Sequence, residues 1–336
     1  DWTQMFAEQA ELAAYTQAVI DKHGLRAHAR LETTVTDLVW QAGPRRWRIE
    51  TDRGAWLARF VINASGPLST PVVPPFPGRE TFTGAAFHTN RWDHSVDLAG
   101  KRVAVVGSGA SAAQVIPAIV DRVAALHVFQ RTPHWVLPRA DRVFAPWQRR
   151  LLRWGPAQRA LRAAIYWQLE SRVIAFKYSP TMLKLVAERD ARRHLAEQVP
   201  DPALRARLTP DYTIGCKRIL LSNTLLPALS HPRTTLHDRH DGVREIHPGG
   251  IRTAGGHDLA LDVIVWATGF DATDGVISYG VTGEGGRTLR EAWAEFPRAY
   301  LGTAMPGFPN LFIVTGPNTG IGHTSALFII ESQLNY

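Results

Sequence analysis

Residues 102–119 read RVAVVGSGASAAQVIPAI, and this stretch decides the fold. The apolar run RVAVVG predicts a buried strand, and the residues from Ser108 to about Val123 predict a helix. Gly107 allows a tight turn, Gly109 lets the backbone approach a pyrophosphate, and the small Ala112 lets the helix pack closely. The N–H groups of the first helical turn attract phosphate. The predicted cofactor-binding residues are Gly107, Ser108, Gly109, Ala110, Ser111, Ala112 and Gln114.

The next strand pattern indicates which nucleotide this turn binds. ALHVFQR, residues 125–131, completes a βαβ unit and therefore predicts a parallel sheet. An NAD site places an acidic residue at the end of this strand, whereas here Gln130, Arg131 and Thr132 follow it. Because a guanidinium can pair bidentately with a 2′-phosphate, we expect NADPH, with Arg131 and Thr132 in its site. The alternatives are an ordinary strand-to-helix turn and a solvated arginine.

Composition favours a globular protein. The chain has 336 residues, of which 45% are hydrophobic and 20% charged, enough for one large or two ordinary domains. It contains no apolar run long enough to span a bilayer and no signal-peptide pattern. The single cysteine, Cys216, excludes an intrachain disulfide and fits a reducing compartment, so we expect a cytoplasmic protein. Because the sequence begins with Asp1 rather than Met, we also expect a fragment of a longer protein.

The net charge of +8 comes from one segment. Residues 139–211 contain 15 Lys and Arg against 7 Asp and Glu, with the basic residues spaced along helical patterns. We interpret these as solvated helix faces rather than a polyanion site, because no nucleic-acid motif accompanies them. Trp147, Trp154 and Trp167 lie in the same segment, and we expect them in a core or lining a substrate tunnel.

The remaining patterns place this unit within a larger α/β fold. Residues 1–25 predict a helix that ends at Gly24, and residues 28–65 predict a small antiparallel sheet whose last strand, WLARFVINAS, is buried. A proline-rich stretch, residues 66–78, predicts an extended connection. Residues 141–210 predict a helical insertion, and β patterns resume at about residue 234.

A second motif lies just before the glycine turn. FTGAAFHTNRWD, residues 82–93, resembles the fingerprint of the Baeyer–Villiger monooxygenases, which are class B flavin monooxygenases. The matching positions are Phe82, Gly84, His88, Trp92 and Asp93. The segments QRTPHW, GCKR and ATGF follow in the order that the family shows. Flavin monooxygenases that oxidise amines or sulfides have a similar fingerprint, but the Trp-Asp ending favours the Baeyer–Villiger branch.

The resemblance implies a flavoprotein with two dinucleotide-binding domains, one for FAD and one for NADPH. It implies that NADPH and O2 are consumed to convert a ketone to an ester or lactone through a C4a-peroxyflavin, without a metal. By the same resemblance Arg218 is catalytic, Lys217 binds the 2′-phosphate, and His88 is a hinge residue. Residues Asn63–Pro71 and Val314–His323 resemble the loops that line the flavin, although ordinary glycine-rich turns are an equal alternative.

The sequence departs from the family at both ends. The family begins with a βαβ unit for the ADP part of FAD, which this sequence lacks, and a C-terminal part is also absent. We expect residues 1–75 and 271–336 to belong to the FAD-binding domain, and residues 76–270, with the insertion 141–210, to the NADPH-binding domain. The missing unit leaves open a non-catalytic NADP-binding fragment as an alternative to an enzyme.

Overall fold

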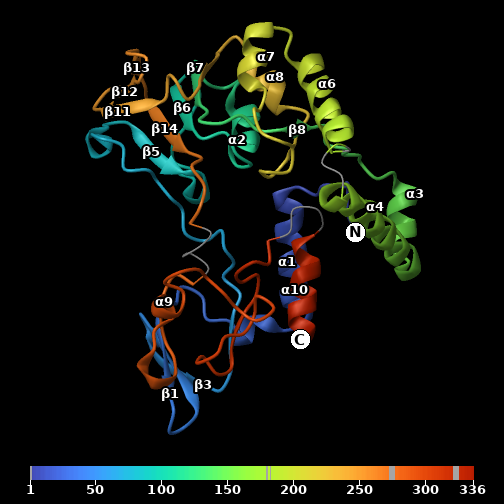
Figure 1. Cartoon of the computed structure of the whole chain (residues 1–336), viewed down its shortest axis with the longest axis vertical. Helices are drawn as coiled ribbons and strands as arrows, with labels where there is room; N and C mark the ends of the chain where they lie inside the picture. The colour runs from blue at the N-terminus through green and yellow to red at the C-terminus, as the bar shows by residue number, and fades with distance from the viewer. Residues whose placement is uncertain (1, 179–180, 182, 272–276, 321–324) are drawn as a thin grey trace. The chain divides into compact units, whose positions relative to one another are not determined.

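The computed structural model describes residues 2–178, 181, 183–271, 277–320 and 325–336, which form two compact units (Figure 1). Unit 1 consists of residues 1–67, 140–173 and 273–336. Unit 2 consists of residues 68–139 and 174–272. Each unit therefore joins segments that are distant in sequence, and each is described by itself.

Unit 2 is built on a five-stranded sheet in which every pair of neighbouring strands is parallel. In spatial order the strands are β10 (Thr234–His237), β7 (Ala125–Phe129), β6 (Arg102–Val106), β14 (Val263–Trp266) and β5 (Ala85–His88). Val103, Ala104 and Val105 at the centre are completely buried, as expected for a strand covered on both faces. The predicted buried strand and parallel βαβ unit are confirmed.

Two helices cover one face of this sheet. α2 (Ala112–Ile119) follows β6 directly and packs against α8 (Leu225–Leu229). α2 buries Ala112, Ile116 and Ile119 in the main hydrophobic cluster of the unit. The helix is shorter than its sequence pattern because residues 108–111 form the turn. Figure 1 shows α2 next to β6.

Smaller elements complete unit 2. A three-stranded antiparallel sheet packs its Ile246, Ile251 and Leu259 with residues of the parallel sheet. Its strands are β11 (Val243–His247), β12 (Gly250–Thr253) and β13 (Asp258–Ala260). The other elements are β8 (Val136–Leu137), β9 (Leu220–Leu221), the π-helical stretch Leu183–Glu188, α6 (Arg189–Gln198) and α7 (Pro202–Leu208).

Unit 1 contains a four-stranded sheet and a separate parallel pair. The sheet has the order β15 (Gly280–Thr282), β1 (Val35–Gln41), β2 (Arg46–Thr51) and β3 (Gly54–Ala58). The pair is β4 (Val61–Asn63) with β16 (Leu311–Ile313). Trp47 is fully buried, and its indole N–H donates to the Pro309 carbonyl oxygen at 2.7 Å. Trp47 packs with Leu38, Phe308 and Ile313.

The prediction of one buried strand over WLARFVINAS is wrong. The segment forms two strands in different sheets, β3 and β4, and Trp56, Leu57 and Ile62 are all at least half exposed. The physical reason is the register of β2 with β3, which pairs Trp47 with Ala58. β2 begins at Arg46, only one residue before Trp47. The chain therefore runs past the start of β2 soon after Ala58, has no further partner in that sheet, and pairs with β16 instead.

The helices of unit 1 include the first part of the predicted insertion. They are α1 (Gln9–Lys22), α3 (Pro146–Leu152), α4 (Gly155–Tyr178, up to residue 173 in this unit), α9 (Leu289–Ala292) and α10 (Ala326–Asn335). The prediction that Trp147, Trp154 and Trp167 lie in a core or tunnel is wrong, because they are 67%, 62% and 68% exposed. The half-buried side of α4 instead carries Leu161 and Ile165. Among the described helices, none has the length and apolar character needed to cross a membrane.

Candidate nucleotide-binding site

The glycine turn between β6 and α2 combines one glycine required by the fold with one that is not. Gly107 has φ +117°, and a Cβ there would lie 2.2 Å from the Ala267 carbonyl oxygen. Only glycine therefore fits at this position. A Cβ on Gly109, in contrast, would meet no protein atom within 4 Å. The space beside Gly109 is open, as close approach of a ligand to the backbone requires.

The turn lies at the carboxyl end of the sheet, next to the end of β7. The Gly107 N–H donates to the Phe129 carbonyl oxygen at 3.0 Å, and the Ser108 hydroxyl lies 3.3 Å from the carbonyl oxygen of Thr132. Ala110 and Gln114 are exposed at the start of α2, and the N–H groups of Ala113 and Gln114 already donate to the carbonyl oxygens of Gly109 and Ser111. This edge is where open parallel sheets bind ligands. The predicted residues 107–112 and 131–132 therefore lie together.

Lys217 and Arg218 lie on a loop that is fastened to the same segment. The Tyr212 hydroxyl donates to the Pro133 carbonyl oxygen at 3.0 Å, and the Trp135 indole donates to the Tyr212 carbonyl oxygen at 2.9 Å. The Lys217 ammonium lies 4.9 Å from the centroid of the Tyr212 ring. Arg218 is exposed. Two cations thus project from a loop anchored just after Arg131 and Thr132.

His134 connects this loop with the glycine turn. It lines a small cavity together with Ser108 and Gln130. Burial lowers the pKa of His134, the nearby Lys217 charge lowers it further, and a hydrogen bond with the Arg218 backbone opposes both effects. A neutral imidazole follows at physiological pH. The positive charge available here to a phosphate therefore comes from the arginine and lysine side chains.

The fingerprint residues hold β5 and its flanking turns in place. A Cβ on Gly84 would lie 2.4 Å from the Asp262 carbonyl oxygen, and Phe82 packs with the adjacent apolar cluster. Trp92 packs edge-on against Phe87, with ring centroids 4.9 Å apart. Asp93 accepts hydrogen bonds from the backbone and hydroxyl of the nearby Ser95. The spacing of the motif thus has a packing explanation.

His88 is buried at the carboxyl end of β5. Its Nδ1 accepts a hydrogen bond from the Asn90 N–H at 3.1 Å, so Nε2 carries the proton and donates to the Gly269 carbonyl oxygen at 3.1 Å. Burial lowers the pKa of His88, although the Gly269 contact opposes the shift. The ring is therefore neutral and fastens the segment after β14 to β5. A role as a hinge stays a prediction.

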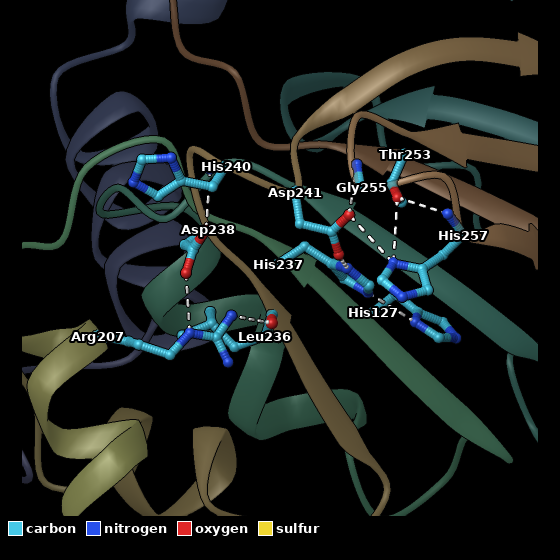
Figure 2. A network of polar contacts seen from close by, with 10 residues as sticks. All are labelled: His127, Arg207, Leu236, His237, Asp238, His240, Asp241, Thr253, Gly255 and His257. Atoms are coloured by element: carbon cyan, nitrogen blue, oxygen red, sulfur yellow. Dashed lines mark hydrogen bonds and ion pairs between the residues drawn. The ribbon is translucent and has the colours of Figure 1, made fainter.

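A polar network at the β10 edge was not predicted from the sequence (Figure 2). His237 Nδ1 donates to Asp241 Oδ2 at 2.7 Å, and its Nε2 lies 3.1 Å from Nδ1 of His127 on β7. His257 lies 3.2 Å from the other carboxylate oxygen of Asp241. Burial, followed by the His237 charge, lowers the pKa of His127 to about 4. Only the pair His237 and Asp241 is close in sequence, so the pattern could not reveal the rest.

This network adjoins the strand end that precedes Arg131. The Gln130 N–H donates to the His237 carbonyl oxygen at 2.7 Å, and the Gln130 amide donates to the Arg207 carbonyl oxygen at 3.3 Å. Arg207 in turn pairs with Asp238 at 2.9 Å. The ring of His237 also stacks on Phe129, with centroids 4.6 Å apart. Gln130 is therefore fixed from two sides.

The two loops expected to line the flavin both follow strands of the parallel pair in unit 1. Asn63 ends β4, is buried, and accepts a hydrogen bond from the Tyr279 hydroxyl at 3.0 Å. The Val314 N–H donates to the Asn63 carbonyl oxygen at 2.9 Å, which joins the starts of the two loops. Residues 321–323 of the second predicted loop lie outside the described residues.

This architecture defines a class of protein. A family model described as pyridine nucleotide-disulphide oxidoreductase matches residues 2–185, more than half of the chain. The closed crystal structure of cyclohexanone monooxygenase superposes with a TM-score of 0.88 at 28% identity, covering all of this chain and 70% of that one. The structure of oxidized steroid monooxygenase bound to NADP gives 0.85 at 33% identity, covering all of this chain and 71% of that one. The fold is that of flavoproteins with two dinucleotide-binding domains.

Comparison with curated relatives identifies the family. A Baeyer-Villiger monooxygenase of Streptomyces coelicolor is 46% identical over 337 residues, and one of Pseudomonas aeruginosa is 44% identical over 338 residues. Both alignments cover all of this chain, which spans 64% of the length of each relative. The chain belongs to the Baeyer–Villiger monooxygenase family.

Proposed function

We propose that the protein is an NADPH- and O2-dependent flavin monooxygenase that converts ketones to esters or lactones. The observation that carries this proposal is the grouping of the open glycine turn, Arg131 and the Lys217–Arg218 loop at the carboxyl edge of one parallel sheet, which also contains the fingerprint strand β5. The relatives named Baeyer-Villiger monooxygenase support the reaction class. The ketone itself is not specified by these residues.

The turn fits the pyrophosphate of NADPH. The open space beside Gly109 admits the phosphates, and the N–H groups of the turn itself, from Gly109 to Ala112, would bind them. Arg131 and Lys217 would bind the 2′-phosphate, with Thr132 beside them. The buried Asn63 and the loop after Val314 would face FAD, which supplies the oxygen-activating chemistry when bound. We assign these two loops of the FAD site to this chain.

Arg218 would act as a fixed positive charge. A guanidinium stays protonated at any working pH and stabilises negative charge that develops on a reacting oxygen, provided that water is excluded. Arg218 is exposed on unit 2 taken alone, so its role requires that bound cofactor or the rest of the protein covers it. His88, neutral and hydrogen-bonded at both nitrogens, would position the chain rather than transfer a proton.

Three further assignments belong to this proposal. Residues 1–75 and 271–336 would contribute to the FAD-binding domain, and residues 76–270 would contribute the NADPH-binding domain. The partners would be a small ketone and O2, without nucleic acid. The protein would work in the cytoplasm, as the single Cys216 suggests.

The test uses the full-length protein that contains this chain. We expect the purified protein to carry flavin, visible by its absorbance, and to oxidise NADPH faster when a suitable ketone is added. Mass spectrometry with isotope-labelled O2 should find one labelled oxygen in the ester or lactone. Oxidation of amines or sulfides in the same panel, with every linear, cyclic and aromatic ketone unchanged, would overturn the proposed substrate class.

A variant tests the residue that we consider catalytic. Arg218→Ala should abolish ester formation while NADPH still reduces the flavin, because the guanidinium is needed after reduction. Arg244→Ala, which removes an exposed arginine of β11 in the same unit, is the matched control and should retain both activities. If Arg218→Ala still forms ester at the normal rate, the role proposed for Arg218 is wrong.

A further inference from the structure

Large apolar side chains are exposed together on and beside α3. Trp147, Leu151 and Trp154 are 67%, 50% and 62% exposed, and Val143 just before the helix is 75% exposed. Trp147 and Leu151 are spaced at i and i+4, which places them on one side of α3, and Trp154 lies in the short turn between α3 and α4. Single exposed apolar residues are common, but a clustered set of this size indicates an interaction surface.

The surrounding segment is strongly basic. Residues 139–169 contain seven arginines, whereas Asp141 is the only acidic residue among them. The exposed arginines next to the apolar face include Arg150 and Arg153. Arg162, further along, pairs with Glu331 of α10. The partner of this surface is therefore expected to be anionic as well as apolar.

The exposed aromatic residues do not lie on the side by which these helices pack against the rest of unit 1. α4 directs Leu161, Ile165 and Leu169 toward a cavity of about 510 Å³ that Phe328 of α10 also lines. Trp167, on the same helix, is instead 68% exposed. The packing side and the aromatic side of this helix are therefore different, and both belong to unit 1.

We propose that α3 and the adjoining start of α4 form a docking surface for an anionic lipid bilayer. Tryptophan favours the interfacial zone of a bilayer, where the ring is partly dehydrated, and arginines beside it attract anionic headgroups. Leu151 and Val143 add aliphatic surface that enters the acyl boundary but cannot stack on nucleic acid bases. The two tryptophans alone would also suit base stacking, so it is the aliphatic side chains beside them that favour a bilayer over a single-stranded polynucleotide.

The proposed attachment is peripheral. α3 has only seven residues, and the arginines lie beside the tryptophans rather than at the ends of a long apolar run. The apolar face would enter the headgroup region while the rest of unit 1 stays in water. This surface is separate in sequence from the glycine turn and from Lys217–Arg218. The proposal goes beyond the proposed oxidation and does not depend on it.

Co-sedimentation of the full-length protein with vesicles tests the proposal. We expect binding to vesicles of phosphatidylcholine with phosphatidylglycerol, weaker binding to phosphatidylcholine alone, and loss of the difference at high salt. The triple variant Trp147→Ala, Leu151→Ala, Trp154→Ala should lower the partition coefficient at least about tenfold. The double variant Arg150→Glu, Arg153→Glu should remove the preference for anionic lipid.

A matched control distinguishes binding by this surface from nonspecific binding of exposed apolar side chains to vesicles. Trp56→Ala with Leu57→Ala removes two comparably exposed apolar side chains from β3 of the same unit and should leave partitioning unchanged. Circular dichroism and NADPH binding confirm that each variant is folded. The proposal is overturned if the triple variant binds vesicles as the unmodified protein does, or if only a single-stranded oligonucleotide binds to the α3 surface.

Discussion

Asp241 accepts a 2.7 Å hydrogen bond from Nδ1 of His237, and this contact lies at the edge of the parallel sheet (Figure 2). Because a carboxylate can only accept, the proton resides on Nδ1. When both rings are neutral, Nε2 of His237 accepts from Nδ1 of His127, 3.1 Å away. One carboxylate therefore sets the orientation of a buried ring on β10 and, through that ring, of a second on β7.

Replacing Asp241 should destabilise unit 2 and change its response to acid. Burial alone would raise the pKa of Asp241, but hydrogen bonds hold it well below its usual range. Their donors are Thr253, His237, His257 and the Gly255 backbone. Since this pKa is depressed, its stabilisation is complete above about pH 4 and is lost as the pH falls further. We expect Asp241→Asn to lower the unfolding free energy by about 1 to 3 kcal/mol at neutral pH, measured by urea denaturation.

The control for this prediction is Asp258→Asn. Asp258 also pairs with a histidine, His247, at 2.8 Å, but its side chain is 56% exposed. An exposed pair contributes less than about 1 kcal/mol. Equal losses in the two variants would show that burial does not strengthen the Asp241 contacts.

His127 should make the stability fall between pH 6.5 and pH 4. Its pKa in the folded protein is about 4, below its ordinary value, so the unfolded chain binds more protons in this window. Stability therefore rises with pH there and is highest above it. In His127→Gln the decline should be smaller by about 1 to 2 kcal/mol, after allowance for solvent screening. Urea denaturation at several pH values measures this, and identical pH profiles of the two proteins would contradict it.

The dinucleotide-binding unit could be predicted because its signals are local. A buried strand, two glycines, a small residue and a helix follow one another over residues 102–119, and β6 and α2 form there. The glycines at positions 84 and 107 have a further cause that is not local, since each approaches the backbone carbonyl of a residue far along the chain, Asp262 or Ala267, too closely for a side chain.

What sequence reasoning missed depends on contacts between distant segments. His127 meets His237 across 110 residues, and the split of WLARFVINAS follows from where β2 begins and from pairing with β16. The exposure of Trp147 depends on which side of α3 packs, because both sides of the segment carry apolar residues, and Trp154 lies in the turn between α3 and α4. A periodic pattern cannot distinguish the two sides.

Replacing the two glycines of the turn should have different effects: one replacement should lower stability and the other should weaken NADPH binding. Gly107→Ala should lower the unfolding free energy by about 3 kcal/mol or more, because of its φ of +117° and the clash with the Ala267 carbonyl oxygen. Gly109→Ala meets no protein atom, so stability should change by less than about 1 kcal/mol. Its Cβ would instead occupy the space for the pyrophosphate and weaken NADPH binding about tenfold or more. Urea denaturation and fluorescence titration with NADPH measure the two effects, and an unchanged NADPH affinity in Gly109→Ala would place the pyrophosphate elsewhere.

Arg131 should decide between the two nicotinamide nucleotides. Its guanidinium is exposed just after β7, beside Thr132, whose carbonyl oxygen faces the Ser108 hydroxyl of the turn. Arg131→Ala should weaken NADPH binding by about ten- to a hundredfold and leave NADH binding nearly unchanged, because only NADPH carries the 2′-phosphate. Arg122→Ala, which removes an exposed arginine paired with Asp97 in the same unit, is the control and should alter neither affinity. If Arg131→Ala weakens both nucleotides equally, the arginine does not contact the 2′-phosphate, and Lys217 becomes the remaining candidate.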